Sequence, residues 1–325
     1  MALNDARELG RGGAAGVDPA APPKAKRSLL ARRKGRIGIW YVMPWVIGFF
    51  LWYAIPMVAS LWFSFTDFNL VDTKPTEFIG LHNWSTLIGD PEAKQAVINT
   101  VQFGLISLPF SILVPMALAY LLISKNLKFR NGFRLLFYLP SVIPLVAAVL
   151  LFGGILNGQT GWVNRLLAGI GIDGPNWFLD EFWVYPSLTF LGLWGVGNAM
   201  IIFIAGMNSV SSDLYDAATI DGASQFRLFR HITLPMVSPV IFYQLIISLI
   251  GLFNYFLIPF VLTNGLGRPN GRTIFYALYF FRQGFRLFDM GYAAALAWAL
   301  FIAAIAITGL LFWSAKYWVH YEYVE

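Results

Sequence analysis

The chain has 325 residues, of which 58% are hydrophobic, 17% aromatic and only 12% charged. Soluble domains carry charge on about a quarter of their residues, so this composition argues against a soluble protein and predicts several membrane spans. The formal net charge is +6, but the basic residues cluster beside apolar runs, which argues against nucleic-acid binding. There is no cysteine, and His82, His231 and His320 lie in separate loops or tails. We therefore expect no disulfide, no thiol nucleophile and no metal site.

The N-terminal 36 residues are rich in Gly, Ala and Pro and then become basic. A segment of this composition cannot bury a core, so we predict that 1–36 is a disordered basic tail. The apolar stretch at 37–64 is too long for the cleavable part of a signal peptide. We interpret it as a retained membrane span that opens a transmembrane domain over 37–325.

Six apolar segments are long enough to cross about 30 Å of hydrocarbon as helices. They are continuously apolar and do not alternate as membrane strands would. We therefore predict an all-α integral membrane protein with six transmembrane helices. The predicted spans are 37–64, 97–123, 135–156, 184–206, 238–263 and 291–315.

Two of the connecting segments contain apolar residues at near-helical spacing. They are 78–96, with Trp84 and Leu87, and 157–183, with Trp162 and Leu166. Each is either an amphipathic helix lying on the membrane or an ordinary packed loop, and the sequence leaves both interpretations open.

The distribution of Lys and Arg predicts the orientation of the chain. If the N-terminus is cytoplasmic, the basic tail and the connections at 124–134 and 207–237 all lie inside, as the positive-inside rule requires. The connection at 264–290 then lies outside and carries four arginines against the rule. The larger number of basic residues favours both termini in the cytoplasm.

The six predicted spans contain no Asp, Glu, Lys, Arg or His. Ion-coupled transporters need an ionisable relay within the membrane, and membrane enzymes need carboxylates or histidines in or beside their spans. We therefore predict no catalytic residue. The amides of Asn198, Gln244 and Asn254 either bond neighbouring helices or line a path for a neutral, hydroxyl-rich solute. Aromatic residues that could stack on a sugar lie nearby, namely Trp194, Phe253 and Tyr255.

The polar connection at 207–237 predicts two short helices joined by a glycine. Ser211-Ser212-Asp213 is a helix-start signal, and 214–220 continues the helix for two turns. Gly222 can adopt the left-handed conformation that ends a helix, and Ser224 can cap a second one. Pro235 suits the first turn of the next span. A polar structured segment of this kind is suited to docking in a groove of a cytoplasmic partner.

The same connection carries a motif, Asp216-Ala217-Ala218-x3-Gly222-x9-Ile232-x-Leu234-Pro235. It resembles the EAA signature of permease subunits in binding-protein-dependent ABC importers. The family usually has Glu where this chain has Asp216, which keeps the charge but shortens the side chain by one methylene. The resemblance implies the type I ABC importer permease fold, with a coupling helix in this cytoplasmic loop. It also implies that these seven residues couple the chain to an ATPase.

Further matches extend over most of the chain after residue 36 and resemble the carbohydrate-uptake branch of that family. They are Pro56, 64–67, 78–83, Asn99-Thr100, Phe253-Asn254, 262–265, Thr273 and 291–295. The resemblance implies that the chain translocates a sugar or oligosaccharide across a bacterial or archaeal plasma (inner) membrane. It implies as partners a second homologous permease, two ATP-binding cassette subunits, an extracytoplasmic sugar-binding protein and membrane lipid. This chain would hold no cofactor, because the ATPase subunits bind ATP and Mg.

In maltose-type permeases the spans before and after the EAA loop contact the sugar. The resemblance carries this role to Trp194, Gly195 and Asn198, and to Phe253 and Asn254. Phe253 and Asn254 match in residue type, whereas Trp194 and Asn198 match in position only. Two alternatives remain open. The same transporter class carries glycerol phosphate or polyols, and a membrane scaffold or enzyme would work without an ATPase.

Overall fold

The computed structural model describes residues 29–124 and 127–320. Within these ranges every regular element is a helix, and β-type pairing is limited to two isolated bridges, Thr66 with Phe78 and Asn69 with Asp289. The predicted all-α class is confirmed. The chain divides into two compact units, one ending at Met57 and the other beginning at Val58.

In its described residues the first unit consists of a long helix that continues past Met57 into the beginning of the second unit, and the stretch Ile39–Phe63 forms a candidate membrane span. Helix α1 (Leu29–Phe49) continues through a π-helical turn, η1 (Phe50–Ala54), into α2 (Ile55–Phe63). The wide turn comes directly before Pro56, which has no N–H to donate to the preceding turn. Helix α1 begins eight residues before the predicted span, so residues 29–36 of the predicted tail are helical. The rest of that tail, 1–28, lies outside the described residues.

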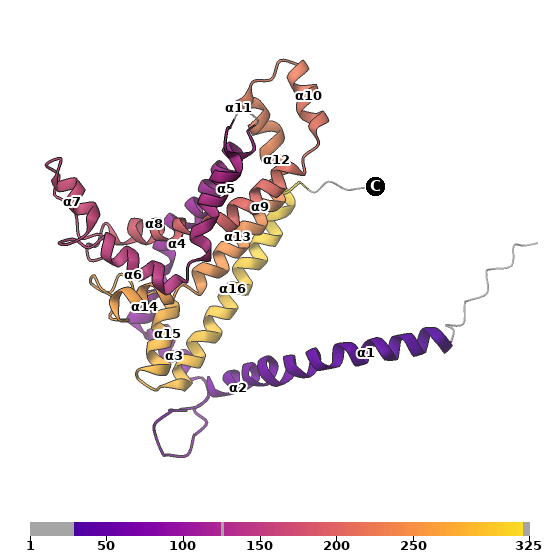
Figure 1. The fold of residues 1–325 in the computed structure, drawn as a ribbon. Coiled ribbons are helices and arrows are strands. Elements are labelled where there is room, and N and C mark those ends of the chain that lie inside the picture. Colours follow the sequence, from indigo (N-terminus) through magenta and orange to yellow (C-terminus); the bar gives the residue numbers. More distant parts are fainter. Residues whose placement is uncertain (1–28, 125–126, 321–325) are drawn as a thin grey trace, which may run out of the picture. The chain divides into compact units, whose positions relative to one another are not determined.

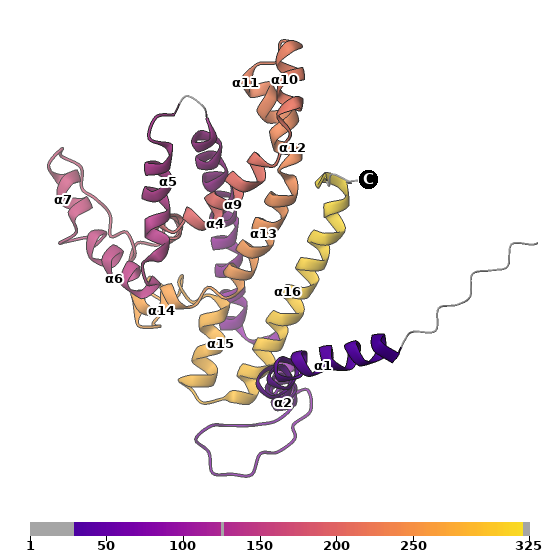
Figure 2. The same ribbon diagram turned by 45° about the vertical axis from the view of Figure 1, so that its right-hand side comes forward.

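The second unit contains the other helices (Figures 1 and 2). In chain order these are α3 (His82–Gly89), α4 (Pro91–Ile123), α5 (Arg130–Tyr138), η2 (Leu139–Val142), α6 (Leu145–Ile155), α7 (Trp162–Ala168), α8 (Val184–Trp194), α9 (Gly197–Asn208), α10 (Ser212–Ile220), α11 (Gln225–Leu228), η3 (Phe229–Thr233), α12 (Leu234–Met236), α13 (Ser238–Phe253), α14 (Leu257–Thr263), α15 (Tyr276–Phe285) and α16 (Met290–Trp318).

The described residues contain four helices, or nearly straight helix pairs, that are long and apolar enough to span a membrane. Two further helix pairs pass the same test but are sharply bent, so the number of spans is four to six. The four are Ile39–Phe63, Pro91–Ile123, Ser238–Thr263 and Met290–Trp318. The sequence predicts continuous helices over 135–156 and 184–206, and the structure corrects both predictions.

The first bent pair turns by 100° between η2 and α6. Ile143 is extended there (φ −72°, ψ 131°), because the ring of the following Pro144 disfavours a helical conformation at the residue before it. The second pair bends by 61° between α8 and α9, at Gly195 and Val196. A Cβ on Gly197 would lie 2.6 Å from the carbonyl oxygen of Phe137 in α5. The glycine thus allows the backbones of α9 and α5 to touch.

Helix α4 lies at the centre of the second unit and packs against α8, α9, α13 and α15. Toward α14 and α15 the core contains Phe103, Leu188 and Phe275. Toward α10 it contains Met200 and Phe203, both fully buried. Figures 1 and 2 show α10 and α11 at one end of this unit and α3 and α15 at the other.

The two segments that the sequence left open each contain a short helix, α3 in 78–96 and α7 in 157–183. The segment 78–96 is divided at Asp90, whose carboxylate accepts a hydrogen bond from the Glu92 N–H at 2.8 Å and so begins α4. In 157–183, α7 is followed by a loop that Asn164 holds in place. The Asn164 amide donates to the carbonyls of Gly158 and Gly174 at 2.8 and 3.1 Å.

Candidate functional site

The predicted pair of short helices around Gly222 is present in the structure. Helix α10 begins after Ser211, whose hydroxyl accepts a hydrogen bond from the Asp213 N–H at 3.3 Å. Gly222 has φ +78° and ends this segment, because glycine adopts a left-handed conformation without steric cost. The Ser224 hydroxyl then caps α11 by accepting from the Arg227 N–H at 3.4 Å. The local prediction from the sequence is therefore confirmed.

The seven motif residues divide into an exposed part and an anchored part. Asp216, Ala217 and Gly222 are exposed and Ala218 is half-buried. The remaining three, Ile232, Leu234 and Pro235, are also half-buried. Ile232 and Leu234 pack against the buried cluster that contains Met200 and Phe203.

A second contact ties the exposed part to the anchored part. The Tyr215 hydroxyl in α10 lies 3.0 Å from the hydroxyl of Thr233, which is buried beside α12. Two apolar side chains beside the motif are largely exposed, Ile220 of α10 at 86% and Phe226 of α11 at 71%. The two short helices thus present a carboxylate, small alanines and apolar side chains at the surface, while the Tyr215–Thr233 contact fixes α10 to the residues beside α12.

A pocket of about 290 Å³ lies where α8 bends, between α4, α8 and α13. Its polar lining comes from small hydroxyl and amide groups, and none of the lining residues, all within the described part of the chain, is charged. The polar members are Ser107, Ser111, Thr189, Gln244, Ser248 and Tyr255. This pocket is called the central pocket below.

The polar groups of the central pocket are only partly paired with one another. The Ser111 hydroxyl donates to the Ser248 hydroxyl at 3.1 Å, and the Gln244 amide donates to the same oxygen at 3.3 Å. The hydroxyl of Tyr255 is buried and has no hydrogen-bond partner among the described residues. A buried hydroxyl of this kind costs free energy until something bonds to it.

The structure does not gather the five residues implied by the resemblance in one pocket of this chain. Gly195 lines the central pocket. Trp194 lines a neighbouring pocket of about 620 Å³, and Phe253 lines a third. Asn198 and Asn254 are exposed, and the Asn254 amide donates to the Ile250 carbonyl at 2.9 Å.

Gln244 and Tyr255 were predicted from the sequence as candidate path residues, whereas the serines and Thr189 were not. A signal existed for the serines on α4. Ser107 and Ser111 are four residues apart, as are Gln244 and Ser248 on α13. Residues at this spacing share one helix face, so two polar faces were available to meet.

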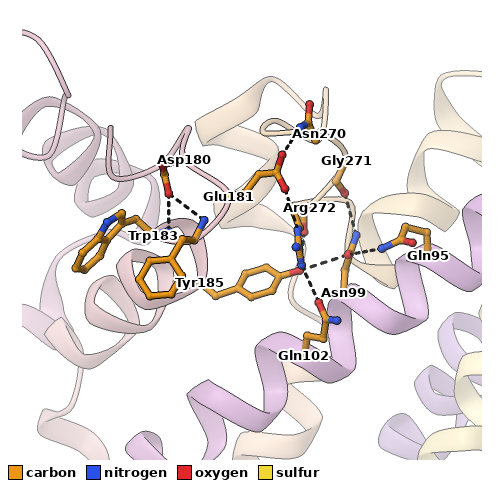
Figure 3. A network of polar contacts seen from close by, with 11 residues as sticks. Gln95, Asn99, Gln102, Asp180, Glu181, Trp183, Tyr185, Asn270, Gly271 and Arg272 are labelled. Atoms are coloured by element: carbon orange, nitrogen blue, oxygen red, sulfur yellow. Dashed lines mark hydrogen bonds and ion pairs between the residues drawn. The ribbon is translucent and has the colours of Figure 1, made fainter. Parts of the chain in front are cut away.

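A second polar cluster lies at the other end of α4 from α10 (Figure 3). Asn99 is fully buried, and its amide donates to the carbonyls of Gly271 and Ile274 at 2.8 and 3.0 Å. The Arg272 guanidinium donates to Gln102 at 3.0 Å and lies 3.8 Å from the Glu181 carboxylate. The sequence marked Asn99 only as a match to the family, and Arg272 is one of the four arginines of the connection 264–290.

A half-buried carboxylate joins α4 to α15 and α16 at the same end. Asp90 accepts hydrogen bonds from the hydroxyls of Tyr279 and Tyr292, each at 2.5 Å. Burial raises the pKa of the Asp90 carboxyl, but hydrogen bonds from these hydroxyls and from the backbone N–H groups of Ala93 and Glu92 lower it by more. The pKa therefore lies below its ordinary value.

Comparison with protein families and with curated relatives consistently finds transport permeases. Residues 111–319 match the family described as "Binding-protein-dependent transport system inner membrane component". The chain is 35% identical over 302 residues to the "Probable ABC transporter permease protein YesP" of Bacillus subtilis (strain 168), covering 92% of this chain and 97% of that protein. It is 31% identical to the "Arabinooligosaccharides transport system permease protein AraP" of the same organism, covering 90% of this chain and 92% of the relative.

A solved structure has the same fold. A chain of a bacterial alginate ABC transporter, in complex with an alginate pentasaccharide-bound periplasmic protein, superposes with a TM-score of 0.78 at 22% identity. The match covers 90% of this chain and 98% of that chain. The resemblance drawn from the motif around Gly222 is therefore confirmed at the level of family and fold.

Proposed function

The chain belongs to the family of inner membrane components of binding-protein-dependent transport systems, and we propose that it is the permease subunit through which an ABC importer passes a sugar or oligosaccharide. Its sequence relatives include permeases named for arabinooligosaccharides, lactose and trehalose/maltose. The observation that carries the proposal is the exposed α10–Gly222–α11 segment, which bears the signature residues on an anchored base.

In this proposal α10 is the coupling helix and faces the cytoplasm, as do both chain termini. One of the two ATP-binding cassette subunits receives Asp216, Ala217 and Ala218 in a groove, where the carboxylate pairs with a basic residue and the alanines allow close approach. Gly222 fixes the angle between α10 and α11, while Ile232 and Leu234 pass the motion of the ATPases into the buried cluster below. ATP and Mg act only in those partner subunits.

The chemistry of the central pocket supports a neutral cargo. Hydroxyl and amide groups match sugar hydroxyls as donors and acceptors, and the unpaired hydroxyl of Tyr255 offers one more hydrogen bond. A phosphate-bearing cargo such as glycerol phosphate would favour cationic side chains, and the described lining contains none. Two arginines of the connection 264–290, which this proposal places outside, already have hydrogen-bond partners within the chain. Arg272 donates to Gln102, and Arg286 donates to the Asn264 carbonyl at 2.5 Å.

The translocation path is completed by a second homologous permease. Asn198 and Asn254 are exposed, and the Asn254 amide uses one of its hydrogen bonds on the Ile250 carbonyl. An amide in hydrocarbon costs a few kcal/mol unless it is paired, so a facing subunit, or a sugar held between two subunits, supplies the partners that these two side chains still need. Trp194 and Phe253 flank these amides in sequence and would add stacking surfaces to the same path.

The test is a reconstituted complex of this chain with its second permease, its ATPases and its extracytoplasmic receptor. Asp216→Ala is expected to lower ATP-driven sugar uptake, whereas Asp221→Ala, which removes a neighbouring exposed charge outside the signature, is expected to leave uptake near that of the parent. Equal uptake in both variants would refute the coupling role. Calorimetry of the receptor with sugars and with glycerol phosphate identifies the cargo class. Purification of this chain free of any ATP-binding subunit would favour a scaffold or an enzyme instead.

A further inference from the structure

We propose that the segment 264–275 is the outer gate of the central pocket and that Asn99 is the residue that holds it shut. The inference rests on the proposed function, since it treats the central pocket as part of the sugar path and this end of α4 as extracytoplasmic. It assigns a role to a buried polar cluster that neither the coupling motif nor the pocket lining uses.

The gate begins as an aromatic layer against the pocket. Phe103 and Tyr255 line the central pocket, and their ring centroids are 4.6 Å apart. Phe275, which is fully buried, packs behind them at 5.1 and 5.2 Å from the two rings. Tyr185 completes the layer at 5.9 Å from Phe103. Because Phe275 belongs to the segment 264–275, this layer cannot open unless that segment moves.

The segment is held through its backbone by one buried amide. The Asn99 side chain donates to the carbonyls of Gly271 and Ile274 and accepts from the Gln95 amide at 3.0 Å. One residue farther along α4, the Thr100 hydroxyl accepts from the Tyr276 N–H at 2.9 Å. Outward movement of the segment would break both bonds from the Asn99 amide to the Gly271 and Ile274 carbonyls and leave the buried N–H groups of that amide unpaired, which is costly. The closed gate is therefore a discrete state.

An outer clasp of side chains covers the same segment (Figure 3). Arg272 reaches Gln102 on α4 and Glu181 before α8, and Asn270 also donates to Glu181. The hydroxyl of Tyr185 lies 3.1 Å from the Arg272 carbonyl oxygen. Glu181 and Gln102 are exposed, and exposed ion pairs contribute little in water. The clasp is thus easy to release, and the buried Asn99 amide provides the main hold.

The backbone of the segment can refold. Gly265, Gly267 and Gly271 all have positive φ, at +68°, +76° and +75°. Glycine reaches these conformations and their mirror images at similar cost. The segment therefore has pivot points on both sides of Arg268 without requiring α14 or α15 to unwind.

Because the chain contains no cysteine, the gate can be locked by a unique pair of introduced thiols. The experiment uses Gln102→Cys/Arg272→Cys in the full complex, with partner chains also free of cysteine and a short bis-methanethiosulfonate as the cross-linker. We expect cross-linking to abolish sugar uptake and receptor-stimulated ATP hydrolysis, and reductant to restore both. The matched control is Lys94→Cys/Ile98→Cys, two exposed positions four residues apart on α4 that belong neither to the clasp nor to the segment 264–275. Its cross-link joins one helix to itself and should leave uptake unchanged.

A second variant removes the hold without a covalent bond. Asn99→Leu is expected to raise receptor-independent ATP hydrolysis by about fivefold, the factor that corresponds to about 1 kcal/mol. It should also make a cysteine at Ser248 react faster with an impermeant thiol reagent added from outside. The reactivity readout separates gate opening from simple loss of stability, which would lower ATP hydrolysis.

The outcomes separate the inference from its premise. Uptake by the cross-linked Gln102→Cys/Arg272→Cys complex at the parent rate would overturn the gate. Loss of uptake in the control pair to the same extent would overturn it as well. A parent complex that imports no sugar would refute the proposed function, while the effect of the cross-link on receptor-stimulated ATP hydrolysis would still test the gate.

Discussion

Replacing Gly222 with alanine isolates the contribution of one backbone angle to ATPase coupling. A Cβ at this position meets no heavy atom within 4 Å, so the substitution introduces no clash. The cost comes from the left-handed backbone at φ +78°, which disfavours a residue with a Cβ by roughly 1–2 kcal/mol. That cost lowers the ratio of native to altered elbow conformations by a factor of roughly 5–30. Asparagine tolerates this region better than alanine, so Gly222→Asn should lose less.

The assay is the apparent affinity of the reconstituted permease pair for its ATPase subunits, measured by titration together with ATP-driven uptake. Binding that requires the native elbow weakens in proportion to the population that retains it, so the order should be parent, Gly222→Asn, then Gly222→Ala. The control is Gly171→Ala after α7, where φ is +81° and a Cβ likewise meets nothing within 4 Å. Equal affinity of the three Gly222 proteins, or an equal loss in Gly171→Ala, would refute the reasoning.

Three further predictions concern packing, pH and the pocket. Gly197→Ala should destabilise the protein by roughly 1–3 kcal/mol, because the added Cβ would lie 2.6 Å from the α5 backbone. The control Gly132→Ala, whose Cβ meets no heavy atom within 4 Å, should leave stability unchanged. Thermal unfolding in detergent compares the two variants. The lowered pKa of Asp90 means that its contribution is complete above the unfolded-state pKa of about 3.9 and is lost as pH falls through the folded-state pKa. Asp90→Asn should therefore flatten the decline of the melting temperature below about pH 4, and an unchanged slope would contradict this. Gln244→Leu should raise the sugar concentration for half-maximal uptake about fivefold, for the loss of about 1 kcal/mol of hydrogen bonding; an unchanged value would remove Gln244 from the path.

Local structure was predictable from the sequence wherever neighbouring residues decide it. The caps at Ser211 and Ser224 and the left-handed Gly222 follow from side chains and backbone preferences within a few residues. The motif itself was also readable, because its spacing is a property of the chain. The sugar-lining role of Trp194, Gly195, Asn198, Phe253 and Asn254 stays a prediction, since four of these residues lie outside the central pocket of this chain.

The two bent spans could not be predicted from the pattern of apolar residues. Apolar periodicity over 135–156 and 184–206 is the same for a straight helix and a broken one, so length alone suggested continuous spans. The 100° and 61° bends depend on Pro144, on Gly195 and on the space that Gly197 leaves for α5. Prolines within membrane helices are often tolerated, and the surrounding helices decide whether such a residue breaks its span.

The sequence by itself determined that this is a membrane protein, that its six predicted spans contain no Asp, Glu, Lys, Arg or His, and that two short helices are joined at Gly222. These features are set by transfer free energy and by local backbone geometry, which act within a few residues. Only the tertiary structure decided that Asn99 bonds to carbonyls 172 and 175 residues away and that serines of α4 meet Gln244 and Ser248 of α13. Such pairings depend on how the bent helices pack against one another. The spacing of polar residues shows which of them share a helix face, but not which helix that face will contact.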